Sequence, residues 1–542
     1  MTAAAYEEIV HPDGRHELTP QAQAGLEHSP LYNEDLAPVR TERRNWTTYS
    51  YMALWIGMSV NVPSWTLAAG MIALGMDWLQ AIFTVALGNL IVLIPMLLNS
   101  HAGTKYGIPF PVFARASFGA YGANLPALIR AGVACGWFGI QTWIGGGAIF
   151  VLVGAILGAD SWWVTASTFQ IGFGDPQPWT LWLSFIIFWA INLYIILKGM
   201  NTLRVFENWS APFLIIVSLG LTVWMVAQAG GVGPIFDQPN AFGGWTGDFW
   251  RIFFPSLMAM IAFWSTLSLN MPDFTRFGRS QRDQTIGQAL GLPTTMTLFA
   301  ILAVFTASAA TVVYANTPNA NVWDPVWLVG QVGNPIVIIL ALFAVALATL
   351  TTNVAANLVS PSYDFSNAWP KLISFRTGGI ITAIVGVLIQ PWYLISDPNV
   401  YIFTWLGFYG GATGAIAGVL IADYWLVRKT VIRLGDLYRP SGIYRYMGGW
   451  NWRAVVALVI GMILAVGGAY SNVVNGAATG PFPEGGLLPF LKFELPWGGF
   501  LYDYSWVVGL IVSLLVYWAL ATFLPEPEQV AAEAPAAAPE AV

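Results

Sequence analysis

The chain has 542 residues, of which 56 % are hydrophobic and only 9 % are charged, whereas charged residues make up about 25 % of an average soluble domain. This composition excludes an ordinary soluble domain and indicates an integral membrane protein. The net charge of −6 gives no sign of a nucleic-acid partner, and the single cysteine, Cys135, excludes a disulfide or a cysteine-based zinc site within one chain.

Both ends of the chain are polar. Residues 1–45 contain the charged stretches HPDGRHEL and RTERRN, where a cleavable signal peptide would need an apolar core. We therefore expect a cytoplasmic N-terminal tail, with the first apolar helix acting as the targeting signal. Residues 526–542 are rich in Pro, Ala and Glu and poor in large apolar side chains, so we expect a disordered cytoplasmic tail.

About twelve segments are long and apolar enough to cross the ~30 Å hydrocarbon core of a bilayer as helices. They lie at residues 49–75, 78–100, 124–157, 179–199, 208–229, 250–272, 286–314, 334–358, 376–396, 400–426, 453–471 and 503–524. A further apolar stretch near residues 322–332 is too short to span, so it is expected at the interface or as a re-entrant segment. The sequence thus predicts an all-α polytopic membrane protein.

The basic residues predict the orientation of these helices. If the loops alternate between the two sides of the membrane, nineteen Lys and Arg residues fall on the side of the N-terminal tail and only Arg251 and Lys492 on the other, while Arg130 lies within the third span. Because cytoplasmic loops carry the excess of Lys and Arg, both termini are predicted in the cytoplasm, with the protein in the plasma membrane or bacterial inner membrane.

Two spans combine a proline with polar residues. The first, WIGMSVNVPSWTLAAG, has Asn61 and Pro63 near mid-depth, and the sixth, FWSTLSLNMPDF, carries a polar run before Pro272. Either one alone fits an ordinary proline kink. Because the two spans hold corresponding positions in two five-helix halves, the pair predicts interrupted helices in an inverted-repeat transporter with its site at the midplane. The expected domains are the repeats 46–230 and 231–430, followed by two additional helices within 431–525.

The third and sixth spans carry candidate substrate ligands. In GWFGIQTWIGGG, Trp137 and Gln141 are one helical turn apart and share a face. Trp264 of the sixth span can supply a second indole and Asn61 a second amide, which together form a slot for a small, flat, neutral ring. The alternatives are that Trp137 belongs to an interfacial aromatic belt and that Gln141 bonds a neighbouring helix.

The eighth span carries two polar faces in ALATLTTNVAAN. Ala348, Thr351 and Thr352 follow i, i+3, i+4 spacing, while Asn353 and Asn357 form an i, i+4 pair on a roughly opposite face. Hydroxyls of the threonine pair, joined by carbonyls released where the first helix unwinds, would form an oxygen cage for a small cation. The alternative is that these hydroxyls bond back to carbonyls of the preceding turn.

Ionisable side chains are scarce inside the predicted spans. Apart from Arg130, the acidic residues near them fall toward span ends, namely Asp77, Glu207, Asp273, Asp364, Asp397, Asp423 and Asp503. Proton-coupled carriers usually place a carboxylate or histidine relay inside the membrane, so this distribution favours sodium without excluding protons. It also offers no Ser/His/Asp, metal-ligand or paired-carboxylate arrangement for an intramembrane enzyme.

Several long motifs, in the same order, resemble the nucleobase:cation symporter family one. They are YGIPFPVFARASFG, GWFGIQTWIGG, TTNVAANLVSP, and ADYWLVRK continuing to LGDLYRPSGIYRY, within about residues 35–470. The resemblance implies the ten-helix 5+5 inverted-repeat core of the leucine-transporter fold plus two C-terminal helices, working by alternating access.

The resemblance also implies roles for individual residues. Stacking tryptophans fall on Trp137 and Trp264, and substrate-bonding amides on Gln141 and Asn357. The sodium ligands would be the carbonyls of Gly57, Val60 and Ala348 with the hydroxyls of Thr351 and Thr352. Two positions depart from the hydantoin-transporting members: Asn61 replaces a glutamine and Thr351 a serine. The retained hydroxyl predicts an intact cation site, whereas the shorter Asn61 predicts room for a different or larger ring substituent.

Together these patterns predict a secondary active transporter that imports a neutral planar ureide or nucleobase, such as allantoin, hydantoin or uracil, coupled to sodium. No cofactor beyond the coupling ion is expected, and the expected partners are the substrate, sodium and lipid, with the chain acting as a monomer. A proton-coupled purine or cytosine permease and an uncoupled facilitator or channel are the alternatives.

Overall fold

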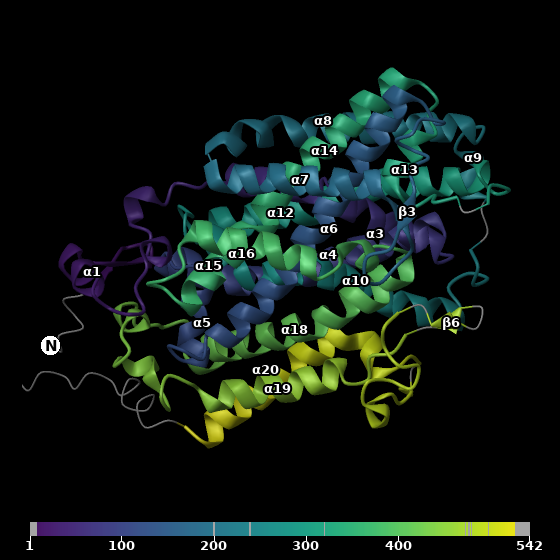
Figure 1. Cartoon of the computed structure of the whole chain (residues 1–542). Helices are drawn as coiled ribbons and strands as arrows, with labels where there is room; N and C mark the ends of the chain where they lie inside the picture. The colour runs from purple at the N-terminus through teal and green to yellow at the C-terminus, as the bar shows by residue number, and fades with distance from the viewer. Residues whose placement is uncertain are drawn as a thin grey trace, which may run out of the picture.

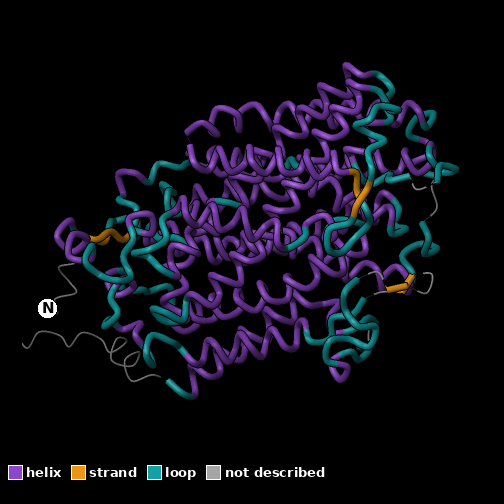
Figure 2. The backbone as a smooth tube through the Cα atoms, in the orientation of Figure 1, coloured by secondary structure: helices purple, strands orange, loops and turns teal. Residues whose placement is uncertain are grey.

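The computed structural model describes residues 8–198, 201–237, 240–318, 320–471, 473–474, 477–478, 480–496 and 498–525. Long helices lie side by side and form the body of the molecule (Figure 1). Within the described residues, the strands form short antiparallel hairpins at the two ends of this bundle (Figure 2). These are β1 (Glu8–Val10) with β2 (His16–Leu18), β3 (Thr168–Phe169) with β4 (Gln177–Pro178), and β5 (Val473–Val474) with β6 (Ala477–Ala478).

The helices account for all predicted spans. The longer ones are α2 (Thr48–Ser59), α3 (Val62–Ala73), α4 (Trp78–Tyr106), α6 (Asn124–Leu157), α7 (Trp179–Lys198), α8 (Asn201–Gln228), α10 (Gly247–Asn270), α12 (Gln281–Val313), α14 (Pro335–Asn357), α15 (Val359–Ala368), α16 (Phe375–Leu388), α18 (Gly407–Ile421), α19 (Trp452–Val466) and α20 (Ser505–Phe523). The shorter ones are α1 (Pro20–Leu26), α5 (Phe110–Phe118), α9 (Gly233–Phe236), α11 (Pro272–Thr275), α13 (Pro325–Gly330) and α17 (Pro391–Leu394).

Eight helical segments of the described chain are long and apolar enough to cross a membrane, and four shorter apolar helices lie in the remaining predicted spans. The expected all-α polytopic fold is therefore confirmed. The apolar stretch near residues 322–332 contains only the six-residue α13, in keeping with a segment too short to span.

The first span is interrupted between α2 and α3. The backbone N–H of Asn61 donates to the Ser59 carbonyl at 3.1 Å rather than to Gly57, its partner in a continuous helix. The Asn61 side chain accepts the Ser64 N–H at 2.8 Å and so caps α3. Pro63 lies in the first turn of α3, where no N–H donor is required.

The sixth span differs from the prediction, because it is not interrupted at mid-depth. Helix α10 continues past Trp264 to Asn270, and Pro272 opens the short helix α11. Met271 between them keeps helical dihedral angles of −52° and −28°. Unlike Asn61, Met271 has no side-chain acceptor with which to cap a new helix. The backbone therefore stays helical from α10 into α11.

Four helices, α2, α6, α10 and α14, carry most residues of the predicted site. Helix α6 packs against α7, α14, α15 and α16, while α14 also contacts α2 and α8. Helix α10 packs against α4 and α18, and α20 and α19 cover α18 from the outside. The predicted domain boundaries near 230 and 430 fall after α8 and after the π-helical segment Ala422–Val427, although the division into repeats stays a prediction.

The N-terminal tail folds onto one end of the bundle, at the left in Figure 1. Leu18, Leu26 and Leu36 are buried in a cluster with residues of the loop that follows α18. The Glu8 carboxylate accepts the N–H of Leu434 at 2.6 Å. We call this the tail end of the bundle, and the end that carries β3, α9 and α13 the opposite end (Figure 1). The predicted disordered tail, 526–542, lies outside the described residues.

Candidate functional site

Trp137 lies deep in α6, which excludes an interfacial belt position for it. Its side chain is 5 % exposed, and its indole Nε1 donates to the Tyr409 hydroxyl at 3.1 Å. The indole also meets the ring of Phe263 edge-on, with centroids 5.0 Å apart. Tyr401 and Trp405, on the π-helical segment Val400–Leu406 that leads into α18, complete the aromatic surroundings.

Trp264 on α10 reaches the same aromatic cluster. Its ring lies edge-on to Phe263 at 4.8 Å and to Trp55 of α2 at 5.2 Å. Phe263 therefore contacts both predicted stacking tryptophans. The sequence analysis missed Phe263 and the tyrosine Tyr409, although the i, i+4 spacing of aromatic residues at 401, 405 and 409 was a signal that could have indicated an aromatic face.

Four buried polar atoms in this region have no hydrogen-bond partner within the described chain. One is an acceptor, Gln141 Oε1, and three are indole Nε1 donors, those of Trp55, Trp264 and Trp405. Gln141 is 3 % exposed and shares the face of α6 that carries Trp137. Because buried polar groups are nearly always paired, an unpaired acceptor on Gln141 together with unpaired indole donors such as that of Trp264 is a pattern that a bound ring with both N–H and carbonyl edges would satisfy.

The two asparagines of α14 make different hydrogen bonds. Asn353 is completely buried, and its Nδ2 contacts the Phe138 carbonyl, the Thr142 hydroxyl and the Asn192 side chain, each at 3.2 Å. Asn357 donates from Nδ2 to Asn353 Oδ1 at 3.1 Å and is 8 % exposed. The contacts of Asn353 are with protein groups, which suits a residue that positions Asn357, while its own contact with a substrate stays a prediction.

Asn61 forms hydrogen bonds on both sides of the break in the first span. Its Oδ1 caps Ser64, and its Nδ2 donates to the Met58 carbonyl. Both side-chain groups therefore bridge the break in the first span, and the residue is 2 % exposed. In this conformation the Asn61 amide stabilises the break between α2 and α3. Its direct contact with a substrate stays a prediction.

Two of the predicted cation ligands, Gly57 and Thr352, meet at that break. Because Asn61 N–H leaves the Gly57 carbonyl, this oxygen instead accepts the Thr352 hydroxyl of α14 at 3.4 Å. The Thr351 hydroxyl donates to the Ala348 carbonyl at 3.0 Å, and Val60 forms the C-cap of α2. Back-bonding by Thr351 fits the alternative structural role, whereas the contact between Thr352 and Gly57 joins the two elements of the predicted cage.

Few ionisable side chains were expected inside the spans, yet one ion pair is buried within the bundle. Arg130 of α6 donates from Nη1 to Asp364 Oδ2 of α15 at 2.8 Å, and both side chains are 0 % exposed. Sequence analysis placed Asp364 near a span end, but the packing of α15 against α6 buries it completely. The scarcity of intramembrane carboxylates is therefore a weaker argument against proton coupling than the sequence indicated.

Comparisons with known proteins find a matching family profile and similar permeases. The family profile described as permease for cytosine/purines, uracil, thiamine, allantoin matches residues 38–485. The allantoin permease of Bacillus subtilis is 39 % identical over 90 % of this chain and 93 % of its own length. The purine-uracil permease of Arabidopsis thaliana is 38 % identical over 90 % of this chain and 78 % of its own.

A solved structure also shares the fold. It is that of a nucleobase-cation-symport-1 family transporter in a closed conformation with bromovinylhydantoin bound. This structure superposes with a TM-score of 0.70 at 26 % identity and covers 92 % of this chain and 98 % of its own.

Proposed function

The chain belongs to the nucleobase:cation symporter family one, whose members are permeases, and from this premise we propose that it imports a small, neutral, planar ureide or nucleobase together with sodium. It is a multi-pass membrane transporter and not an enzyme. Allantoin, hydantoin and uracil are the proposed substrates. We further propose that it lies in the plasma membrane with both termini in the cytoplasm and acts as a monomer.

The unpartnered donor and acceptor of Trp264 and Gln141 carry the substrate proposal. Both belong to uncharged side chains beside an aromatic cluster, so the site suits a neutral ring rather than an ion. Stacking on an indole adds about 0.5–1.5 kcal/mol beyond the apolar area buried, and the amides supply the edge contacts that select among rings. The names of the relatives, which include allantoin and purine-uracil permeases, support this class of substrate.

The oxygen groups at the break in the first span support sodium as the coupling ion. The Gly57 carbonyl and the Thr352 hydroxyl face each other across α2 and α14, and both are hard oxygen ligands of the type that alkali cations prefer. One sodium ion that moves down about 100 mV gains about 2.3 kcal/mol, which at about 1.4 kcal/mol per decade supports roughly 50-fold accumulation.

The buried pair of Arg130 and Asp364 favours a second candidate, a proton-coupled purine or cytosine permease, because a carboxylate inside the bundle is the usual proton carrier. Purified protein in liposomes distinguishes the two. We expect uptake of at least one of labelled allantoin, hydantoin, uracil, cytosine and adenine. Replacement of sodium by choline should abolish accumulation. Unchanged uptake in choline that collapses with a proton ionophore would instead establish the proton-coupled candidate.

A further inference from the structure

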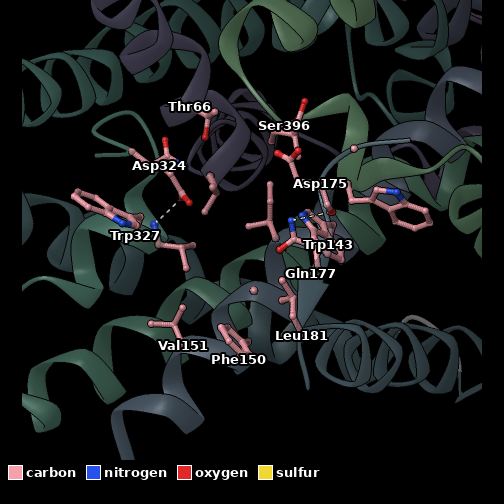
Figure 3. Close-up of a pocket in the computed structure, with 18 of the residues that line it drawn as sticks. Thr66, Trp143, Phe150, Val151, Asp175, Gln177, Leu181, Asp324, Trp327 and Ser396 are labelled. Carbon is pink, nitrogen blue, oxygen red and sulfur yellow. Dashed lines mark hydrogen bonds between the residues drawn. The ribbon is translucent and has the colours of Figure 1, made fainter. Parts of the chain in front are cut away.

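A cavity of about 420 Å³ lies at the opposite end of the bundle, away from the tail. Its walls come from α3, from α6, from the loop between α6 and α7, from α13, and from the segment around α17. Figure 3 shows Asp324 and Trp327 on one side of this space and Trp143, Asp175 and Gln177 on the other, with Thr66 and Ser396 above and Phe150, Val151 and Leu181 below. We call it the outer cavity.

The outer cavity adjoins the candidate substrate site through two shared helices. On α6, Ile144 lines the cavity and follows Gln141 by three residues, which places it one turn along the same face. On α3, Val62 lines the cavity directly after the capping residue Asn61. A small molecule in this space is therefore one helical turn from the substrate site.

Indole rings supply the flat walls. Trp143, Trp327 and Trp392 line the cavity. Trp392 is held firmly, because its Nε1 donates to the carbonyls of Ile171 and Phe173 at 2.9 and 3.0 Å. Trp143 packs on Trp392 with centroids 6.0 Å apart. These contacts fix the ring planes before a ligand arrives, so less side-chain entropy is lost when it binds.

The charged residues that line the outer cavity, Asp175 and Asp324, are both acidic, and their ionised carboxylates can only accept hydrogen bonds. Asp324 Oδ1 accepts the N–H of Val326 at 2.9 Å, which holds its carboxylate in place. Asn321 also lines the cavity, and its Oδ1 is buried with no partner within the described residues. Such a lining attracts molecules that carry several N–H donors and repels anions.

We propose that the outer cavity is a second binding site, which holds a neutral planar ring rich in N–H donors before it enters the substrate site, and which rejects rings that carry a carboxylate. This inference rests on the proposed transport function. The volume lies within the range of about 300–1,000 Å³ typical of small-molecule sites. Indole planes hold the faces of the ring, and the carboxylates of Asp175 and Asp324 accept its N–H groups.

Cysteine protection tests this site independently of the central one. The native thiol, Cys135, is buried, so a Ser396→Cys side chain in the exposed part of the lining can be labelled selectively by a membrane-impermeant thiol reagent. The assay is made in a Trp137→Ala background, which disables the central site. Uracil, hydantoin and allantoin are tested separately, and orotate, which is uracil with an added carboxylate, is the matched anion.

We expect at least one neutral ring to slow labelling by about fivefold or more, while orotate has no effect. Labelling of Ser167→Cys, which is exposed on the loop between α6 and α7 but lies outside the cavity, should be unchanged. Addition of Asp175→Asn and Asp324→Asn should remove the protection, and the exposed loop change Asp160→Asn should preserve it. Lack of protection by every ring, equal protection by orotate, or protection by sodium alone would overturn the proposal.

A second measurement covers the case in which the Trp137→Ala chain does not fold. With Trp137 intact, Asp175→Asn should raise the KM for uptake about fivefold and leave the maximal rate unchanged; an unchanged KM would overturn the second site. If the chain with Trp137 intact takes up a ring but no ring protects Ser396→Cys from labelling, the second site is refuted and the transport function is not. If a ring protects Ser396→Cys but the chain with Trp137 intact takes up none of the rings, the transport function is refuted and the second site is not.

Discussion

Asn357 and Asn353, one turn apart on α14, are joined by a hydrogen bond of 3.1 Å from Asn357 Nδ2 to Asn353 Oδ1. Asn353 in turn is tied to α6 through the Phe138 carbonyl and the Thr142 hydroxyl. These two residues directly follow Trp137 and Gln141 in the chain. The bond therefore fixes the amide of Asn357 relative to the proposed ligands of α6.

We expect Asn353→Ala to raise the KM for uptake by about tenfold, because the Asn357 amide loses the acceptor that orients it. The maximal rate should change less. Asn192→Ala, which removes only one partner of Asn353, serves as the milder control. Concentration-dependent uptake into liposomes measures both variants, and an equal or larger effect of Asn192→Ala would contradict a positioning role for Asn353.

The threonine pair should determine the dependence on sodium. Thr352→Ala removes the hydroxyl that meets the Gly57 carbonyl, so the sodium concentration for half-maximal uptake is expected to rise about tenfold or more. Thr352→Ser should restore most of the affinity. Thr349→Ala, on the same helix and with a buried hydroxyl that has no partner in the described chain, is the matched control. Equal sodium dependence in all three variants would exclude the proposed cage.

Both the ring and the N–H group of Trp137 should contribute to substrate binding. Trp137→Ala removes the stacking surface and should abolish binding at the central site, so that only binding to the outer cavity remains. Trp137→Phe keeps a smaller ring but loses the bond to the Tyr409 hydroxyl, so binding should weaken by about tenfold. Trp162→Phe changes a 62 % exposed indole and should have no effect. Equilibrium binding of labelled substrate to detergent-solubilised protein measures the series, and wild-type affinity in Trp137→Ala would refute this site.

Removing one partner of the buried Arg130–Asp364 pair should destabilise the protein much more than removing both. Asp364→Leu leaves the Arg130 guanidinium unpaired at 0 % exposure, and breaking such a pair costs about 3–5 kcal/mol. The double variant Arg130→Met, Asp364→Leu should recover much of that loss. Asp13→Asn, which breaks a surface pair with a 46 % exposed carboxylate, should cost under about 1 kcal/mol. Thermal unfolding in detergent ranks these variants, and a double variant less stable than the single one would disprove the argument.

Asp324 should make stability depend on pH. Burial raises the pKa of its carboxyl from 3.8 to about 6. Between these values the unfolded chain has released a proton that the folded protein still holds, so folding stability falls as pH rises from about 4 to about 6 and then levels off. Asp324→Asn keeps a capping side chain for α13 without the charge. Its unfolding midpoint should exceed that of the wild type near about pH 7.5 and match it near about pH 4; a constant difference would exclude this cause.

Local patterns predicted the helices well and their interruptions less well. Asn61 with Pro63 and Asn270 with Pro272 give the same polar-then-proline signal, yet the helix breaks only at the first. The difference lies in the residue that can cap: Asn61 accepts the Ser64 N–H, whereas Met271 directly before Pro272 has no such acceptor and stays helical. In the same way, spacing alone put Asn353 and Asn357 on one face but could not show that Asn353 holds the amide of Asn357 in place.

The sequence by itself determined the membrane class, the twelve apolar segments, the family and most of the candidate ligands, because hydropathy, periodicity and motifs are properties of neighbouring residues. Only the tertiary structure decided which distant groups meet: Thr352 with Gly57, Arg130 with Asp364, and Phe263 with both Trp137 and Trp264. It also created the outer cavity from segments that lie far apart in the chain. Such contacts depend on how whole helices pack, and packing sums many weak contacts that no local stretch of sequence encodes.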